Sequence, residues 1–219
     1  MLSTTPSVAE IAYRFVKDLV LNDRVAGGSM ITEGEIAGQL AVSRTPVREA
    51  FLRLEAEGWL RLYPKRGAVV VPIAAGEAQA VVDARLLLEV HAVESLTDPE
   101  QRARLRAALE GLIAAQSDAL DRGDLESYSD HDTAFHLAIV AAGANPLLTS
   151  FCVSLRERQH RMTARSLWRD VDRARGFVRG HARLAALIGA GDARGFGDEL
   201  RGHLRDAHLS ERAADAATL

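Results

Sequence analysis

The sequence has one cysteine, few aromatic residues and no long apolar run. Cys152 cannot form a disulfide within the chain, which favours a reducing compartment such as the cytosol. No apolar run approaches the roughly 20 residues that cross a membrane. Residues 1–10 also lack the charged and apolar segments of a signal peptide. We therefore expect a cytoplasmic protein with no membrane partner.

The composition favours helices, and the charged side chains are distributed unevenly. Aromatic residues make up only 5% of the 219 residues, whereas Ala, Leu and Arg are abundant. The net charge of −3 neither favours nor excludes nucleic acid, but residues 44–66 hold six basic and three acidic side chains. All seven histidines follow residue 90. This separation predicts two domains, over residues 1–73 and 78–214, joined by a short linker.

Three helices are predicted in the first domain. Apolar residues recur at helical spacing over residues 8–21. Thr32 and Glu35 form a capping box that starts a second helix. A third helix is predicted to begin at Pro46, with Thr45 as its N-cap. Its apolar face is a stripe at helical spacing, made of Val47, Phe51 and Leu54.

Two short strands complete a winged helix-turn-helix, and the rest of the chain is helical. Apolar residues alternate over residues 59–63, "PKRG" is a turn, and residues 68–73 read as a second strand. Beyond residue 78 only helical patterns occur, so we expect a mainly α protein whose second domain is an all-α antiparallel bundle. The expected helices of the bundle cover residues 78–96, 99–122, 124–143, 146–170, 176–190 and 193–214.

The third helix carries side chains that can read DNA. In a helix-turn-helix the second helix of the pair enters the major groove. Arg44 and Arg48 are one turn apart on the face opposite the apolar stripe, and arginine suits bidentate contacts to guanine. Exposed helix charges are common, but the helix order and the basic wing favour contact with DNA. The expected DNA-binding residues are Ser43, Arg44, Thr45, Arg48, Lys65, Arg66 and Gly67.

This segment resembles the DNA-binding domain of GntR-family bacterial transcription regulators. The run "SRTPVREA", residues 43–50, carries most of the likeness. The resemblance implies a homodimer that binds a palindromic operator in double-stranded DNA. Gly34 departs from the pattern, because several relatives carry a basic or polar side chain there that touches DNA. The other matching residues are Gly28, Glu33, Ala37, Leu40, Leu54, Gly58 and Gly67.

Four residues of the histidine-rich domain can form a metal site. Asp132 and His136, in the stretch "DHDTAFH", are four apart and therefore share a helix face. His181 and His203 lie on two later predicted helices, which can face that helix across a bundle. Three imidazoles and one carboxylate suit Zn²⁺, Ni²⁺ or Mn²⁺ and leave a coordination position open. Periodicity alone also allows an ordinary surface Asp–His pair.

Residues 78–209 resemble the helical effector domain of the FadR subgroup, called FCD. The likeness rests on "RLLLE" from Arg85, on "DTAFHLAIVAAGANPLL" and on "HARLAALIGAGDARGFGDELRGHL". The resemblance implies a divalent metal that anchors a small organic acid as effector. The implied metal ligands are Asp132, His136, His181 and His203.

Two further residues are candidates for contact with the effector. Arg85 can clamp a carboxylate bidentately, or it can pair with Glu89 four residues on. Asn145 can donate to the effector, or it can cap the helix that starts at Pro146. The residues alone leave both alternatives open for each.

The remaining histidines have plainer interpretations. His131 points about 100° away from Asp132 around the helix and is expected at the surface. His160 lies among several arginines, including Arg156, and is also expected to be solvated. His91 can either line the cavity or pack.

Together these patterns predict a DNA-binding transcription regulator, with repression relieved by the effector as the mode that the family implies. An open metal site can also generate hydroxide, so one alternative is a metal-dependent hydrolase with a DNA-binding arm. No general base accompanies the ligands, and we therefore expect no catalytic residues. The other alternative is a DNA-binding protein whose metal is purely structural.

Overall fold

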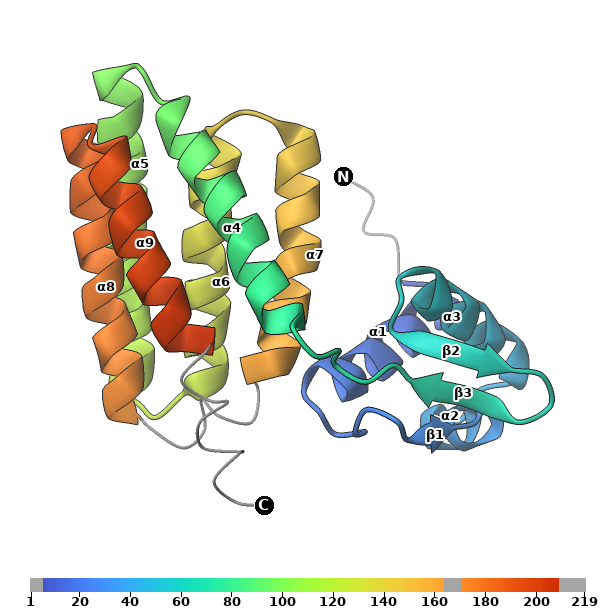
Figure 1. Cartoon of the computed structure of the whole chain (residues 1–219). Helices are drawn as coiled ribbons and strands as arrows, with labels where there is room; N and C mark the ends of the chain where they lie inside the picture. The colour runs from blue at the N-terminus through green and yellow to red at the C-terminus, as the bar shows by residue number, and fades with distance from the viewer. Residues whose placement is uncertain (1–5, 164–170, 209–219) are drawn as a thin grey trace. The chain divides into compact units, whose positions relative to one another are not determined.

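The structure is a computed structural model that describes residues 6–163 and 171–208. The chain divides into two compact units between Ala74 and Ala75. Figure 1 shows the small sheet in the first unit and only helices in the second. The chain is thus mainly helical, as predicted. The expected helix ends at residues 170 and 214 lie outside the described residues.

The N-terminal unit packs three helices against a small sheet. Its helices are α1 (Val8–Leu21), α2 (Glu33–Leu40) and α3 (Arg44–Ala56). Its strands are β1 (Met30–Ile31), β2 (Leu60–Tyr63) and β3 (Gly67–Val70), paired antiparallel in the order β1-β3-β2. The predicted apolar stripe of α3 lies fully inside the core of this unit, with Val47, Phe51 and Leu54 each 0% exposed. This burial turns the opposite face of α3 to solvent.

The starts of α2 and α3 show one correct and one wrong prediction. The capping box of α2 is confirmed, because the Thr32 hydroxyl accepts from the Glu35 amide and a Glu35 oxygen accepts from the Thr32 amide at 2.8 Å. The prediction of Thr45 as the cap of α3 is wrong. The helix begins at Arg44, so Ser43 holds the N-cap position, and its side chain makes no capping bond.

Strand β1, which has only two residues, was not predicted from the sequence. Ile31 pairs with Ala68 of β3, one residue after Gly67. Gly67 has φ +118°, and a Cβ there would lie 2.4 Å from the Ile31 carbonyl oxygen. Only glycine allows this backbone conformation and this close approach. The glycine at the base of the wing therefore lets a third strand join the hairpin.

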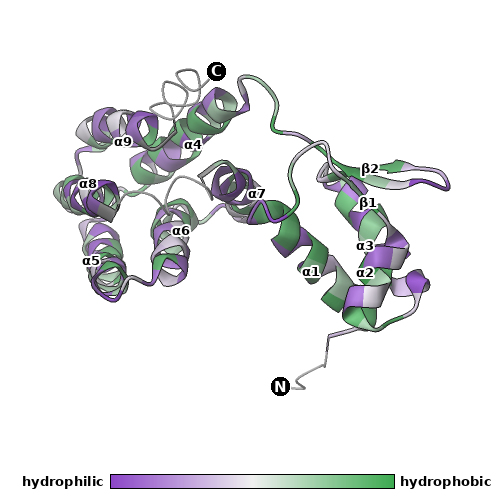
Figure 2. Cartoon of the chain, turned by 90° about the horizontal axis from the view of Figure 1, so that it is seen from below, coloured by the Kyte–Doolittle hydropathy of each residue, from purple (hydrophilic) through white to green (hydrophobic). Residues whose placement is uncertain are grey.

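In residues 75–163 and 171–208, the C-terminal unit has six helices that pack side by side. They are α4 (Glu77–Glu94), α5 (Pro99–Asp121), α6 (Leu125–Ala142), α7 (Pro146–Thr163), α8 (Val171–Ala190) and α9 (Ala193–His208). In Figure 2, α5, α6 and α8 are seen nearly end-on, so their axes run alongside one another. Helix α5 packs against α6 and α8, and α4 packs against α6, α7 and α9. The main apolar core includes Leu109, Phe135, Ile139, Leu184, Ile188 and Leu200.

Helix α8 starts five residues earlier than predicted. The sequence suggested a break near Gly176, but the helix begins at Val171 and runs through this glycine. A glycine inside a helix costs only about 1 kcal/mol relative to alanine, and packing of the apolar face supplies more than that. None of the described helices combines the length and apolar character that a membrane span requires.

Candidate metal centre and nucleic-acid interface

The predicted DNA-binding residues lie at the start of α3 and in the wing between β2 and β3. Ser43, Arg44, Thr45 and Arg48 are all exposed, because the buried stripe of α3 turns this face outward. A groove of about 900 Å³ lies between α3 and the wing. Five of the seven predicted residues line this groove, namely Arg44, Arg48, Lys65, Arg66 and Gly67.

The basic side chains of this unit fall into two groups. Arg14, Lys17, Arg24 and Arg53 each form an ion pair with a carboxylate. In the part of the chain that the structure describes, no ion pair neutralises the four basic side chains of the groove, which are Arg44, Arg48, Lys65 and Arg66. Unpaired cations in one groove repel one another, and their summed field attracts phosphate. The groove therefore has the charge that a DNA backbone requires.

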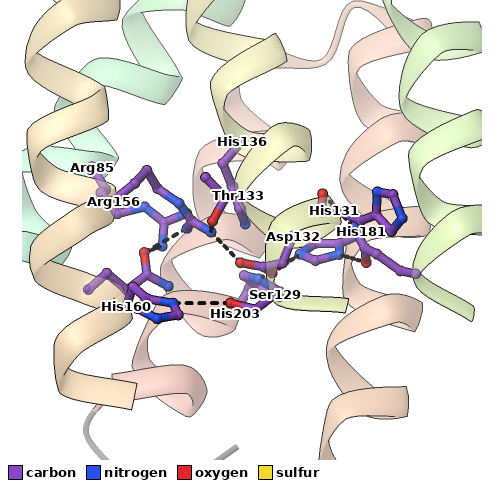
Figure 3. A network of polar contacts seen from close by, with 12 residues as sticks. Arg85, Ser129, His131, Asp132, Thr133, His136, Arg156, His160, His181 and His203 are labelled. Atoms are coloured by element: carbon purple, nitrogen blue, oxygen red, sulfur yellow. Dashed lines mark hydrogen bonds and ion pairs between the residues drawn. The ribbon is translucent and has the colours of Figure 1, made fainter. Parts of the chain in front are cut away.

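The structure brings three of the four predicted metal ligands together in the helical unit. One ligand atom from each of His136, His181 and His203 lies within 4.8 Å of the others. The three side chains come from α6, α8 and α9, and they are 1%, 0% and 8% exposed. Figure 3 shows them converging beside Asp132. Tertiary packing has thus assembled a buried cluster from residues up to 67 positions apart (136 to 203).

Asp132, the fourth predicted ligand, lies next to this cluster but is held by an arginine. Its Oδ2 accepts a short bond from Arg156 Nη2, and its Oδ1 lies 3.4 Å from His181 Nε2. Burial opposes ionisation of Asp132, but the surrounding groups, Arg156 first among them and Arg85 further away, together outweigh burial and hold the pKa of this carboxyl below its usual value. Asp132 is therefore an anion at neutral pH, within reach of the cluster.

The hydrogen bonds around His181 determine which of its nitrogens carries a proton. Gln116 donates through Nε2 to the His131 carbonyl, so its Oε1 faces His181 Nδ1 at 2.7 Å. Nδ1 must donate, which leaves a lone pair on His181 Nε2. His181 Nε2 lies 3.2 Å from His203 Nε2. Two nitrogens that bind the same Zn²⁺ at ordinary lengths are about 3.3 Å apart, so the spacing fits a shared cation.

His136 is oriented in a similar way. Its Nδ1 lies 2.7 Å from Glu89 Oε2, which leaves Nε2 as the nitrogen that can bind a metal. Carboxylates and amides that hold the second nitrogen of a ligating imidazole are a regular feature of metal sites. Glu89 of α4 and Gln116 of α5 are both 0% exposed, so the two supports are as buried as the histidines.

Burial keeps these histidines neutral. It lowers the pKa of His181 from 6.5 to about 4, and it also places the pKa values of His136 and His203 well below the usual value. The positive charge of Arg85 adds to the effect at His136. Neutral imidazole is the form that binds metal, so these side chains need to lose no proton to do so at neutral pH.

Gly180 makes room for His203 against α8. A Cβ at this position would lie 2.7 Å from His203 Nδ1, closer than any ordinary contact. A side chain larger than hydrogen would therefore push His203 away from His181. The sequence analysis gave Gly180 no role, since only packing shows which glycine touches the site.

Two buried arginines lie beside the histidine cluster. Arg85 is fully buried and forms an ion pair with Glu89 at 2.9 Å. Arg85 Nη1 and Arg156 Nη1 both donate to Gln159 Oε1. Arg85 Nη2 and Arg156 Nε make no hydrogen bond, although Arg85 Nη2 takes part in the ion pair. Buried donors without an acceptor cost free energy, which a ligand with acceptor oxygens can recover.

The two candidates for effector contact are placed differently. The pair between Arg85 and Glu89 is present, and Arg85 also reaches the cluster. The exposed Asn145 side chain accepts from the amides of Leu147 and Leu148, so it caps the start of α7. Contact of either residue with an effector stays a prediction.

The sequence analysis missed several residues of the site. It grouped His160 with solvated arginines, but His160 is half-buried against Ser129, and Arg156 is buried. Gln116 and Gln159 were not singled out, because glutamine has no spacing signal that distinguishes a buried support from a surface residue. His91 is exposed, and His131 is half-buried and contributes its carbonyl.

A winged helix-turn-helix with an unpaired basic groove, followed by a helical unit with a buried polar site, defines a DNA-binding transcription regulator. Comparison with known proteins shows the family. Residues 8–70 match the family of bacterial regulatory proteins called gntR, and residues 80–206 match the FCD domain. The chain belongs to the GntR family and carries an FCD domain.

Relatives of this chain are transcription regulators. An uncharacterised HTH-type regulator of Agrobacterium vitis is 32% identical over 135 residues, which are 61% of this chain and 79% of the relative. Another, from Streptomyces ambofaciens, is 29% identical and covers 94% of this chain and 90% of its own. The gluconate operon transcriptional repressor of Bacillus subtilis is 28% identical, over 64% of this chain and 57% of the repressor.

Solved structures share the fold. Escherichia coli McbR/YncC has a TM-score of 0.70 at 22% identity and covers 96% of this chain and 97% of its own. A GntR regulator from Rhodococcus sp. RHA1 has a TM-score of 0.75 at 19% identity, over 95% of this chain and 99% of that one. Membership of the GntR family and the likeness to regulators in sequence identify the chain as a transcription regulator, which decides against a metal-dependent hydrolase.

Proposed function

We propose that this regulator is a repressor whose affinity for its operator is controlled by a small carboxylate effector bound at a metal site in the helical unit. The observation that carries the proposal is the convergence of three buried, neutral imidazoles from α6, α8 and α9. His136, His181 and His203 would hold the ion, with Asp132 as the fourth ligand. A divalent ion there supplies an electrophile to which a carboxylate oxygen can bind.

The charges of the site support an anionic effector. Without an ion, the buried cluster contains two guanidinium groups, Arg85 and Arg156, and two carboxylates, Glu89 and Asp132, so its charges balance. A divalent cation would leave a net charge of +2 inside the unit. Buried charge without a counter-charge is strongly unfavourable, and an organic acid would offset it.

The unfilled donors of the arginines support a carboxylate in particular. Arg156 Nε has no hydrogen-bond acceptor among the described residues, and Arg85 Nη2 lies 2.9 Å from Glu89 Oε1 in an ion pair without a hydrogen bond. Arginine binds carboxylate oxygens through paired N–H groups, and such charge-assisted bonds are about twice as strong as neutral ones. In this proposal Arg85 orients one end of the effector. The capping bonds of Asn145 make it the weaker candidate for such contact.

The N-terminal unit would read the operator. Arg44 and Arg48 would contact base edges in the major groove, while Ser43, Thr45, Lys65, Arg66 and Gly67 would contact or approach phosphates. A homodimer would place two such helices on the two halves of a palindromic site. Repression is supported by the likeness to the gluconate operon repressor. Binding to chromosomal DNA would place the protein in the bacterial cytoplasm.

Metal analysis of the purified protein tests the site. Wild-type protein should retain about one Zn²⁺, Ni²⁺ or Mn²⁺ per chain after dialysis, and His181→Ala and His203→Ala should each lose it. His91→Ala is the matched control, since His91 is an exposed histidine on α4 outside the cluster. Full retention of metal in both cluster variants would refute the proposed ligand set.

A thermal-shift screen of organic acids, with and without the retained metal, tests the effector. A ligand that binds only the folded state raises the unfolding temperature by mass action. An acid that stabilises only the metal-loaded protein should weaken binding to an operator selected from random DNA. By reciprocity, the operator should then weaken binding of the acid by the same factor. If no acid changed operator affinity and metal loss only melted the helical unit, the metal would be purely structural.

A further inference from the structure

Arg44 and Gly34 touch across the helix-turn-helix. Gly34 lies in the first turn of α2, and Arg44 is the first residue of α3. A Cβ built at Gly34 would lie 3.2 Å from Arg44 Nη2 and 3.5 Å from its Cζ. The guanidinium therefore occupies the space that a side chain at position 34 would need.

Among the described residues, no ion pair or hydrogen bond sets this direction of Arg44. The side chain is exposed, and the described residues offer it no ion pair or hydrogen bond. A long, exposed arginine samples many rotamers unless a surface holds it. Here its guanidinium lies beside Gly34, within 3.6 Å of where a Cβ at this position would stand, at the edge of the groove that both residues line.

Direction matters for base recognition. Arginine reads guanine through two parallel N–H groups that must meet O6 and N7 together. A guanidinium that is turned away from this alignment can still reach a phosphate, but it cannot meet both guanine acceptors together. The base preference of the protein thus depends on what stands at position 34.

We propose that Gly34 is a positioning residue for DNA recognition. By having no side chain, it lets Arg44 lie across the first turn of α2 and so sets the base that Arg44 prefers. This inference rests on the proposed contact between Arg44 and base edges. A side chain at position 34 would turn Arg44 away and change the preferred base at one position in each half-site.

Substitution by leucine tests the proposal, with a matched control in the same helix. Full-length wild type, Gly34→Leu and Gly38→Leu would each select binding sites from random duplex DNA. A Cβ at Gly38 meets nothing within 4 Å, so Gly38→Leu should select the wild-type site. Leucine favours helices over glycine at both positions, so neither variant should unfold more easily.

For Gly34→Leu we expect a loss of about tenfold in affinity for the wild-type site, with binding to unrelated duplex unchanged. Gly34→Ala should give a smaller loss, because the tip of Arg44 can shift slightly. In the Arg44→Ala background, Gly34→Leu should have no further effect on site preference. That result would show that position 34 acts through Arg44.

The outcomes separate this inference from the proposed interface. If Arg44→Ala selected the same site with the same affinity as wild type, the base-reading role of Arg44 would be wrong. If Arg44→Ala lost the preference but Gly34→Leu kept it, only the positioning role would be wrong. A loss by Gly34→Leu that was equal on selected and unrelated duplexes would also overturn that role.

Discussion

Among the residues that the structure describes, Arg44 and Arg48 of the N-terminal unit stand in solvent without an ion pair, whereas Arg85 and Arg156 of the C-terminal unit are buried against Glu89 and Asp132. Arginine is thus exposed to water in one unit and buried in the other. An exposed guanidinium is stabilised by water and stays available to an external anion. A buried one needs fixed internal partners, because the interior screens charge poorly. The exposed arginines are therefore available to bind DNA, whereas the buried arginines are held by fixed partners and help to define the shape of a small site.

The largest effect should come from breaking the buried arginine cluster. Arg85→Met leaves Glu89 buried without its main counter-charge, and we expect a loss of about 3–5 kcal/mol in the free energy of unfolding. Urea unfolding of the full chain measures this loss, provided that the unfolding of the helical unit is followed separately from that of the N-terminal unit. The control is Arg106→Met, which removes an exposed pair with Glu110 at the same i,i+4 spacing and should cost at most about 1 kcal/mol. Equal losses in the two variants would contradict the contrast between buried and exposed pairs.

The next effect should separate two arginines of helix α3. Arg48→Ala should weaken specific operator binding by about 1–3 kcal/mol and leave the unfolding temperature unchanged. Arg53→Ala should lower the unfolding temperature and leave operator binding unchanged. Arg53 is paired with Glu10 and stacks 3.6 Å from the centre of the Tyr13 ring. Fluorescence anisotropy with the selected operator, together with thermal unfolding, measures both. An unchanged footprint for Arg48→Ala would mean that the reading helix is wrongly assigned.

Replacing Gln116, which supports His181 in the proposed metal site, should have an intermediate effect. Gln116→Met keeps the size of the side chain but removes the acceptor that orients His181, so metal affinity should fall about 10–100-fold. Competition with a metal indicator measures this affinity. Gln101→Met on the same helix is the control, since Gln101 bonds to the Ala142 carbonyl outside the site. Equal affinities in the two variants would show that Gln116 has only a structural role.

The smallest effect, taken per histidine and per pH unit, should be the pH dependence of the metal-free protein. The pKa of His181 is lowered from 6.5 to about 4, so the unfolded chain binds the proton first as the pH falls. Stability is then fully present above pH 6.5 and is lost on the way down to about pH 4. We expect about 1 kcal/mol per pH unit from each such histidine. Thermal unfolding across this range measures the slope, which His91→Ala should leave unchanged and His181→Ala should reduce.

Much of the N-terminal unit could be predicted from sequence, because its signals are local. The stripe of Val47, Phe51 and Leu54 defines the buried face of α3, and Thr32 with Glu35 marks the start of α2. Strand β1 was missed because two residues carry no periodicity, and it forms only where Gly67 admits the Ile31 carbonyl. The start of α3 was misplaced because Arg44 precedes the proline that usually marks the first helical turn.

The all-helical fold of the C-terminal unit could be predicted from the sequence, but its site could be predicted only in part. Spacing placed Asp132 and His136 on one helix face, and the resemblance to FCD domains added His181 and His203. The structure brings the three imidazoles together. It also shows that Asp132 is bound to Arg156, a residue that the sequence gave no reason to bury.

By itself, the sequence determined the helical periods, the basic helix and wing, and the placement of Asp132 and His136 on one helix face. These follow from the identity of residues a few positions apart, and the backbone geometry of a helix relates such residues directly. Tertiary structure alone decided which arginines are neutralised, which nitrogen of His181 is free, and which glycine each functional side chain lies against. Those properties depend on contacts between distant segments, and only packing brings Gly34 to Arg44 and Gly180 to His203.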